Sequence, residues 1–452
     1  MKKRKVKFSI CILVSLILLI VSIFYRVSIG DYISSIGKEK DYSTDPNLKG
    51  KTIVRVWIRK DNVSSTRGYQ VQKFNEENKD IYVMLSMYKE DYDNLLKTAI
   101  AADRGPDIMT YAYFELIKDN KLANLKDLDL NLDKVGKENL VYYNGEPFGT
   151  RSLEQNVKFI WNKEIFKKAG LNPEVPPKTW SEVLAYSKII KEKCKDVLPL
   201  QFPLNDYQDF KASIGEPSAN SGNIYTTFWD YKKGSYEFSY AKDILSTYNK
   251  LYSEGMLDTN FYNKSRNELR TDFYKGNVAM FLSTYEDKGY FSNIIPLDFD
   301  LGISDLPKVK ENQGNDSYFL TNSNFLSINS EVANKSPKEK EAITKVYNWL
   351  NSQEVNKGIL KTKMAISPLV KDTNIKDDVY KEFNNVKNCK TEEQDPSIFI
   401  SRDSKDTINL SIDAITGKKS VDEVIKSLND NYKNYCEFTE KYRKTDMKKF
   451  KK

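Results

Sequence analysis

The sequence predicts an α/β protein in which helices cover a parallel β-sheet. Short β-rich segments alternate with segments of helical apolar spacing between residues 53 and 111, and this order of elements builds such sheets. The 452 residues are 40% hydrophobic and include 19 Gly and 14 Pro. At about 150 residues per domain, this composition indicates two or three globular domains.

The elements follow one another from residue 53. Residues 53–58 (IVRVWI) predict a strand, and residues 69–78 have the apolar spacing of a helix. Apolar side chains alternate along residues 81–87, which predicts a second strand. Residues 91–103 carry five apolar side chains on one helical face, and a Gly-Pro pair ends this helix before a short strand at residues 107–111.

Ligands of parallel sheets bind beyond the carboxyl ends of the strands. The loops after Trp57 and Met109 are therefore the first places to expect a site. Neither G-x-G-x-x-G nor G-x-x-x-x-G-K-[ST] occurs in the sequence, so these loops carry no dinucleotide or P-loop signature.

The residue types present restrict the chemistry. The chain contains no His, which excludes Ser-His-Asp and Cys-His catalysis, His metal ligands and a histidine pH switch. Cys11 lies in an apolar run, and Cys194, Cys389 and Cys436 stand far apart without C-x-x-C spacing. We therefore expect no metal, no cofactor and no disulfide framework.

The positive charge is confined to the ends of the chain. The net charge is +8, to which residues 1–7 contribute +5 and residues 441–452 contribute +6. The remaining chain therefore carries −3. It lacks the broad basic surface that binding of a phosphate backbone requires, so we expect no nucleic-acid partner.

The N-terminus predicts a membrane segment. Residues 8–25 are uncharged and follow a basic cluster at residues 1–7. Such a stretch just spans a bilayer, and the basic flank stays in the cytoplasm, so the rest of the chain lies outside the cell beyond a linker at residues 26–49. We expect an uncleaved anchor, because the apolar run is longer than the usual core of a signal peptide. The alternative is a secreted protein cleaved near Ser28-Ile29-Gly30.

Several motifs resemble one family. Residues 158–171 (KFIWNKEIFKKAGL) lead into residues 176–183 (PPKTWSEV), where Thr179 and Glu182 predict a capping box at the start of a helix. This pattern resembles the sugar-binding group of ABC-importer solute-binding proteins that includes maltose-binding protein. Further segments resemble the family in the same order, at residues 105–108, 255–281, 299–308, 339–352 and 415–435. The similarity extends over residues 50–437.

The resemblance implies a two-lobe, type II periplasmic-binding-protein-like fold with a hinge and a cleft between the lobes. We expect the N-terminal lobe at residues 50–154 plus 304–350 and the C-terminal lobe at residues 155–303 plus 351–440, before a basic tail at residues 441–452. The chain should cross between the lobes near residues 151–154 and 303–306. Closure of the hinge would exclude water around a bound solute.

The resemblance also implies cleft residues, since a sugar site needs aromatic faces beside hydrogen-bonding groups. Candidates are Tyr111 and Tyr113 after the third strand, Gln155 at the first crossing, Ser283 and Tyr285 after residue 280, Asn322, and Trp57 at a strand end. The tyrosines alternatively pack at a lobe surface. Gln155 alternatively satisfies backbone groups of the crossing strands. Trp161 and Trp180 are expected in the core.

The resemblance implies a monomeric, membrane-tethered receptor that captures an extracellular mono- or oligosaccharide and presents it to ABC permease subunits, without covalent chemistry. One alternative is a secreted carbohydrate-active enzyme, which requires two carboxylates about 5–10 Å apart across the cleft. The acidic pairs Asp91 and Asp93, and Asp127 and Asp129, are expected to be solvated instead. The other alternative is a sensor that signals through a partner receptor.

Overall fold

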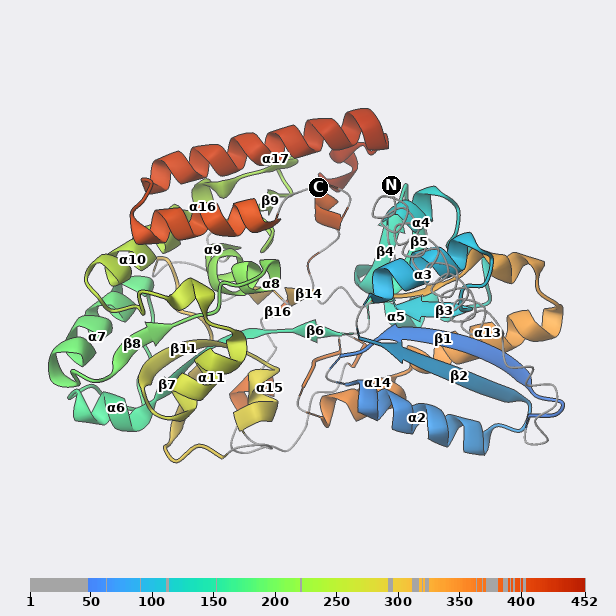
Figure 1. Ribbon diagram of the computed structural model, residues 1–452, viewed down its shortest axis with the longest axis horizontal. Coiled ribbons are helices and arrows are strands. Elements are labelled where there is room, and N and C mark those ends of the chain that lie inside the picture. The colour runs from blue at the N-terminus through green and yellow to red at the C-terminus, as the bar shows by residue number, and fades with distance from the viewer. Residues whose placement is uncertain are drawn as a thin grey trace, which may run out of the picture.

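A computed structural model describes the chain beyond its N-terminal segment. The described residues are 48–61, 63–89, 91–110, 114–151, 153–219, 222–291, 296–310, 317–318, 320–321, 325–362, 364–367, 369–370, 381–384, 389–390, 392, 395–398, 400 and 404–451. The expected anchor at residues 8–25 lies outside them. Within these ranges, no helix has both the length and the apolar character needed to cross a membrane. The described chain forms two α/β lobes that lie side by side (Figure 1).

The first lobe is built on a six-stranded sheet of order β2-β1-β3-β15-β5-β4. Its strands are β1 (Thr52–Arg59), β2 (Ile81–Tyr88), β3 (Ile108–Thr110), β4 (Leu140–Tyr143), β5 (Glu146–Arg151) and β15 (Phe325–Ile328). β1 is parallel to β2 and β3, which confirms the expected parallel start, and β15 runs antiparallel between β3 and β5. β15 thus comes much later in the sequence than β1, the first strand of this sheet, and lies between β3 and β5.

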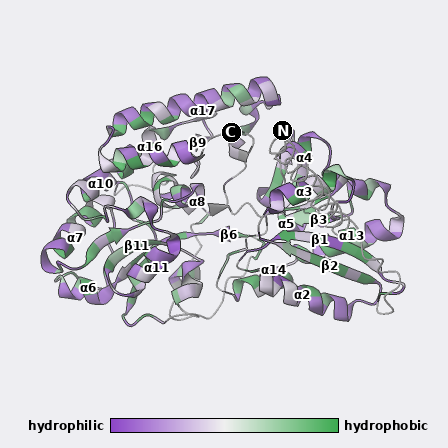
Figure 2. Cartoon of the chain, in the orientation of Figure 1, coloured by the Kyte–Doolittle hydropathy of each residue, from purple (hydrophilic) through white to green (hydrophobic). Residues whose placement is uncertain are grey.

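Helices cover this sheet because their apolar stripes match its apolar faces. α2 (Ser64–Glu77) and α13 (Pro337–Leu350) share one hydrophobic cluster with β1 and β2, while α3 (Tyr92–Ala101) packs in a second cluster with β3. Figure 2 shows apolar residues along the strands and polar residues on the outer sides of the helices. Short helices α4 (Phe114–Lys118) and α5 (Leu132–Val135) complete the lobe.

The second lobe contains a four-stranded sheet of order β12-β7-β11-β8. Its strands are β7 (Val157–Asn162), β8 (Leu198–Gln201), β11 (Val278–Thr284) and β12 (Leu301–Ser304). The helices around it are α6 (Lys163–Lys168), α7 (Trp180–Lys193), α8 (Tyr207–Phe210), α9 (Glu216–Ala219), α10 (Lys242–Ser253), α11 (Arg266–Tyr274), α15 (Lys381–Asn384), α16 (Ser404–Thr416) and α17 (Val421–Arg443).

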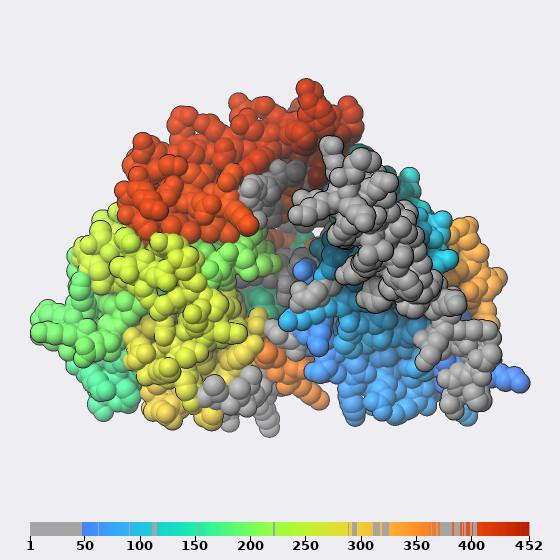
Figure 3. Space-filling view, viewed as in Figure 1, coloured from blue at the N-terminus to red at the C-terminus, as the bar shows by residue number. Residues whose placement is uncertain are grey.

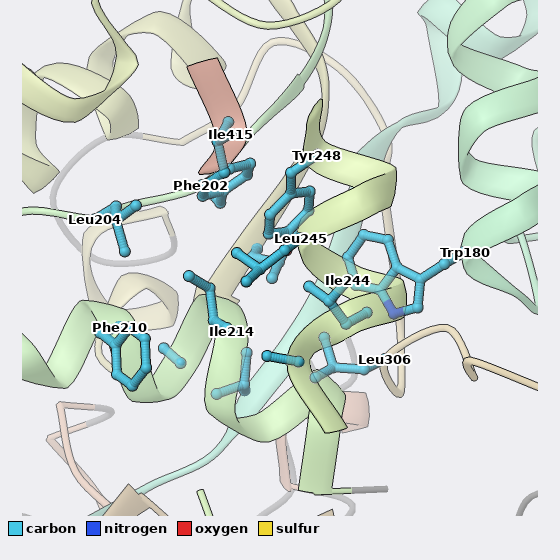
Figure 4. Packing of buried hydrophobic residues seen from close by; sticks show 14 of the residues in the cluster. Trp180, Phe202, Leu204, Phe210, Ile214, Ile244, Leu245, Tyr248, Leu306 and Ile415 are labelled. Carbon is cyan, nitrogen blue, oxygen red and sulfur yellow. The ribbon is translucent and has the colours of Figure 1, made fainter. Parts of the chain in front are cut away.

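The core of the second lobe is aromatic. The rings of Phe202 and Tyr248 stack with centroids 4.1 Å apart, and Trp180 meets Tyr248 edge-on at 5.5 Å (Figure 4). Trp180 is 2% exposed and Trp161 is 3% exposed, so the expected core placement of both is confirmed. Gly302 makes room for Trp161, because a Cβ atom at this position would lie 1.9 Å from Cε2 of the indole.

The start of α7 agrees with the capping motif in one of its two bonds. The Thr179 hydroxyl accepts a hydrogen bond from the Glu182 N–H at 3.2 Å, as expected for an N-cap. The Glu182 carboxylate accepts from the N–H of Lys178 at 2.5 Å, one residue before the N-cap. The reciprocal bond of the motif is therefore displaced by one residue.

Three described segments cross between the lobes. β6 (Glu154–Gln155) pairs antiparallel with β14 (Leu320–Thr321), and Glu154 also bridges Ile366. β6 lies between the two lobes in Figure 1. Together these short pairings make a narrow connection, as a hinge requires.

The second crossing lies later in the chain than expected. Residues 305–310 still belong to the second lobe, because Lys158 pairs with Asp305 at 2.6 Å and the Lys308 carbonyl accepts from the Trp180 N–H at 3.0 Å. The boundary expected after residue 350 also differs. α14 (Gln353–Leu360) packs against α2 of the first lobe, where Gln70 Nε2 donates to the Val355 carbonyl at 2.7 Å.

Candidate ligand-binding site

Gln155 connects the crossing segments. Its Nε2 donates to the Met364 carbonyl at 3.2 Å, and its Oε1 accepts from the Glu286 N–H at 3.0 Å. Both ends of the amide thus bind backbone groups, which agrees with the alternative that Gln155 satisfies backbone groups near the crossing. Contact between Gln155 and a solute stays a prediction.

Tyr285 and Ser283 lie inside the second lobe. Tyr285 is 0% exposed, and its ring meets Phe383 edge-on at 6.5 Å. Ser283 is also buried, and its hydroxyl donates to Asp287 Oδ2 at 3.0 Å. Tyr285 lies in a hydrophobic cluster with Phe273 of α11 and Phe383 of α15, which explains why its ring is covered. In this arrangement neither side chain offers a face to a solute between the lobes.

Asp287 belongs to a buried ion network beneath the end of β11. Arg270 Nε lies 2.5 Å from Asp287 Oδ1, Arg266 Nε lies 3.4 Å from the same atom, and Arg266 Nη1 lies 2.6 Å from Asp209 Oδ1. Burial raises the pKa of Asp287, but the two guanidinium groups outweigh burial and lower this pKa to about 2. The network fixes the end of β11 and the loop that holds Glu286.

Trp57, like Gln155, is an expected site residue that the structure leaves partly exposed. Its ring lies 4.9 Å from that of Tyr88, at neighbouring carboxyl ends of β1 and β2. The Tyr92 hydroxyl lies 3.1 Å from the Trp57 carbonyl of β1 and 3.0 Å from the Thr110 carbonyl of β3. It therefore holds the ends of β1 and β3 together. Tyr111, Tyr113 and Asn322 lie outside the described residues, so their roles stay predictions.

The second lobe also holds a group of side chains that no sequence motif predicted, which we call the tyrosine–carboxylate wall. It consists of Tyr225, Tyr231, Tyr318, Glu216 and Glu392. The Tyr225 ring lies 5.0 Å from that of Tyr231 and 5.6 Å from that of Tyr318. Glu216 Oε1 accepts from the N–H of Tyr318 at 2.9 Å. Aromatic rings and carboxylates are thus placed side by side.

Burial changes the acidity of both carboxyl groups of the wall. Loss of water raises the pKa of Glu216 well above its usual range. It also raises the pKa of Glu392 to about 7, although the nearby Lys211 ammonium favours the charged form. A carboxyl group that keeps its proton near neutral pH can donate as well as accept a hydrogen bond.

The first lobe reaches the wall through Arg151, the last residue of β5. Arg151 is 5% exposed, and its Nη1 donates to the backbone carbonyl of Glu392 at 2.5 Å. The Glu392 carboxylate in turn accepts from the N–H of Thr226 and, at 3.1 Å, from its hydroxyl. An arginine of one lobe is therefore joined to the carboxylate-bearing segment of the other.

The described residues hold no group of three or more Cys, Asp and Glu side chains arranged to bind a metal ion. The expected acidic pairs do not face one another across the lobes: Asp91, Asp127 and Asp129 are exposed, and Asp93 is half-buried. The groups that join the first lobe to the wall are the Arg151 guanidinium and the backbone carbonyl of Glu392.

Two α/β lobes joined by short crossing strands, with an arginine of one lobe bonded to the other, are the architecture of two-lobe binding proteins. Residues 59–357 match the family of bacterial extracellular solute-binding proteins. The chain belongs to this family.

Curated relatives match part of the chain. The sn-glycerol-3-phosphate-binding periplasmic protein UgpB of Salmonella paratyphi A is 27% identical over 260 residues, which is 52% of this chain and 56% of that protein. The probable amino-acid ABC transporter periplasmic-binding protein y4oP of Sinorhizobium fredii is 36% identical over 115 residues, 23% of this chain and 26% of that protein. The chain thus spans about half the length of UgpB.

Solved structures show the same fold over most of the chain. The cyclic α-maltosyl-1,6-maltose-binding protein of Arthrobacter globiformis has a TM-score of 0.68 at 16% identity and covers 85% of this chain and 99% of its own. Maltose-bound MalE3 of T. maritima has a TM-score of 0.65 at 17% identity, with 84% and 99% covered. The Listeria monocytogenes protein Lmo0181 in complex with cycloalternan has a TM-score of 0.63 at 17% identity, with 88% and 100% covered.

Proposed function

We propose that this chain is an extracellular receptor that captures a carbohydrate and delivers it to an ABC-type importer. The observation that carries the proposal is the contact of Arg151 in the first lobe with the tyrosine–carboxylate wall of the second lobe. A solute held there would touch both lobes. Binding energy would then favour the closed arrangement, which is how a hinged receptor responds to its ligand.

The chemistry of the wall suits a polyhydroxylated solute. Tyrosine rings supply flat apolar surfaces for the C–H faces of a sugar, and carboxyl, hydroxyl and guanidinium groups supply hydrogen bonds to its hydroxyls. The names of three similar structures support the same class, since they report binding of cyclic maltosyl-maltose, cycloalternan and maltose, whereas the relative UgpB is named for sn-glycerol-3-phosphate. A carbohydrate is the ligand class most often named among these structures.

We further propose that residues 8–25 tether the receptor to the membrane as an uncleaved anchor and that it acts as a monomer. The extracellular character of the family supports a body outside the cell. Delivery to permease subunits follows from the ABC transporter named for one relative. A carbohydrate-active enzyme gains no support from a family of binding proteins, and a sensor role would use the same binding site.

The test is thermal unfolding of the full-length chain in detergent with maltose, maltotriose, raffinose, xylotriose or sn-glycerol-3-phosphate. A saccharide that binds the folded state should stabilise it by about 2.7 kcal/mol at 100 times its Kd. Replacement of Tyr231 or Tyr318, the two half-buried tyrosines of the wall, by Ala should weaken this binding by about 2 kcal/mol, as for other aromatic anchors. Tyr69→Ala is the matched control, because Tyr69 is 70% exposed on α2.

Stabilisation by sn-glycerol-3-phosphate alone would refute the proposed carbohydrate ligand but would leave the receptor function intact. Equal effects of the Tyr69 and wall variants would refute the placement of the site.

A further inference from the structure

The C-terminal tail, residues 444–451, is attached to the second lobe. The chain reverses after α17 at Lys444, which has φ 55°, and forms a short 3-10 helix, η10 (Met447–Phe450). Trp229 Nε1 donates to the Phe450 carbonyl at 3.0 Å, and the two rings meet edge-on at 6.5 Å. Met447 is 5% exposed and belongs to the main core of this lobe. The tail is therefore a packed part of the fold.

The same region also contacts the first lobe. Arg443, the last residue of α17, lies 3.6 Å from Glu115 in α4. Lys449 Nζ donates to Asn144 Oδ1 at 2.9 Å in the turn between β4 and β5. Figure 1 places the C-terminus between the lobes, and in Figure 3 the red atoms of this region extend from one lobe toward the other above the hollow between them. The tail thus bridges the two lobes.

A cavity of about 540 Å³ lies between the tail and the first lobe. One wall is β4 with its turn, including Tyr142 and Tyr143, and the other is formed by four residues of the tail, Thr445, Asp446, Lys449 and Phe450. The volume falls within the range of about 300–1,000 Å³ that is typical of small-molecule sites. Its two walls belong to different lobes, as in a receptor that closes on its ligand.

The lining of this cavity favours a neutral ligand. Lys137 and Lys449 are balanced by Glu138 and Asp446, so the charged groups around the cavity carry no net charge. Aromatic rings lie on both walls, at Tyr142 and Phe450. Rings combined with hydrogen-bonding groups of both kinds suit a neutral molecule with many hydroxyls better than an ion.

Thr445 provides an independent indication. It is 5% exposed, and its Oγ1 has no hydrogen-bond partner in the described part of the chain. Buried hydroxyls in native proteins are almost always paired, so this hydroxyl, which belongs to a residue of the cavity lining, would gain a partner if a ligand group or a water reached it.

We propose that the C-terminal tail is part of the solute-binding site, and that the cavity between the tail and β4 takes a segment of a neutral oligosaccharide. The inference rests on the proposed function and extends it to residues after α17. A ligand in this cavity would touch both lobes at a point other than Arg151. The tail would thereby contribute to affinity and to the preferred length of the saccharide.

The experiment uses the full-length chain with maltotriose, raffinose and xylotriose as probes, measured by calorimetric titration. A chain that ends at Lys444 should bind the saccharide of the unaltered chain about tenfold more weakly or worse. Thr445→Val should weaken binding by about two- to tenfold, the range for loss of one hydrogen bond. Thr271→Val is the matched control, because this exposed hydroxyl donates to the Asn267 carbonyl within α11.

Melting curves without saccharide separate binding from folding. If the shortened chain melts at a lower temperature, the role of the tail is judged from the saccharide affinities of Thr445→Val and Thr271→Val. Unchanged saccharide affinity in the shortened chain would overturn the role of the tail and leave the receptor function intact. Equal weakening by both threonine variants would also overturn it. Failure of the unaltered chain to bind any saccharide would overturn both the proposed function and this extension of it.

Discussion

Replacement of Glu392 by Gln should remove part of the pH dependence of stability. Glu392 is 5% exposed, and its carboxylate is held by the N–H and hydroxyl of Thr226. Gln keeps the size of the side chain and one acceptor oxygen. Its amide can donate to the Thr226 hydroxyl, so the variant should fold. The charged neighbours that act on Glu392 include Lys211, Asp395 and Glu216.

The magnitude follows from the shift in acidity. The pKa of Glu392 rises from 4.5 to about 7 in the folded chain, so between these two pH values unfolding releases a proton that the folded state retains. The stabilising effect of this proton is fully present below about pH 4.5 and is lost as the pH rises through 7. The difference of roughly 2.5 between the folded-state and unfolded-state pKa corresponds to about 3 kcal/mol in the free energy of unfolding.

The assay is urea unfolding at pH 5 and pH 8. Between these values the unaltered chain should lose about 3 kcal/mol more stability than Glu392→Gln does. Glu341→Gln serves as the control, since Glu341 is exposed on α13. The same pH dependence in the unaltered chain and in Glu392→Gln would refute the reasoning.

Four further outcomes test individual contacts. Asp287→Ala should destabilise the chain by about 3–5 kcal/mol in urea unfolding, because it removes the buried carboxylate that the Arg266 and Arg270 guanidinium groups share. A loss under 1 kcal/mol would contradict this, since ~1 kcal/mol is typical of exposed ion pairs. Tyr285→Ala should cost about 3–5 kcal/mol without any solute present, as a buried aromatic residue does, and an unchanged melting temperature would return Tyr285 to the list of solute contacts. Gly302→Ala should cost about 1–3 kcal/mol and alter Trp161 fluorescence, because the added methyl group overlaps the indole. Ser336→Ala should cost about 1 kcal/mol by removing the capping box of α13, and helicity by circular dichroism should remain close to that of the unaltered chain.

Local patterns in the sequence were sufficient to predict the start of the fold. The predicted strand at residues 53–58 corresponds to Thr52–Arg59, and the predicted helix at residues 91–103 corresponds to Tyr92–Ala101. Both elements carry their own apolar periodicity, which needs no distant partner to be recognised. The placement of the second crossing failed because residues 305–310 stay with the second lobe through contacts with Lys158 and Trp180, more than 100 residues away in the chain.

The candidate site was less predictable for the same reason. The tyrosine–carboxylate wall gathers residues 216, 225, 231, 318 and 392, and these positions form no local motif. Gln155 was correctly placed at a crossing, but its amide binds two backbone groups that come from residues 286 and 364. Tyr285 packs against Phe383, which lies in the short helix α15. The apolar pattern of β11 does not reveal this distant partner.

The position of β15 has a consequence for how the chain folds after export. β15 lies between β3 and β5, so the sheet of the first lobe stays incomplete until Phe325–Ile328 has been synthesised and has crossed the membrane. Until then the edges of β3 and β5 present unpaired backbone groups, which are sites for aggregation and proteolysis. Pairing of segments so distant in the chain is intrinsically slow. The sheet of the first lobe should therefore be completed outside the cell only when nearly three quarters of the chain has emerged, since β15 ends at residue 328 of 452.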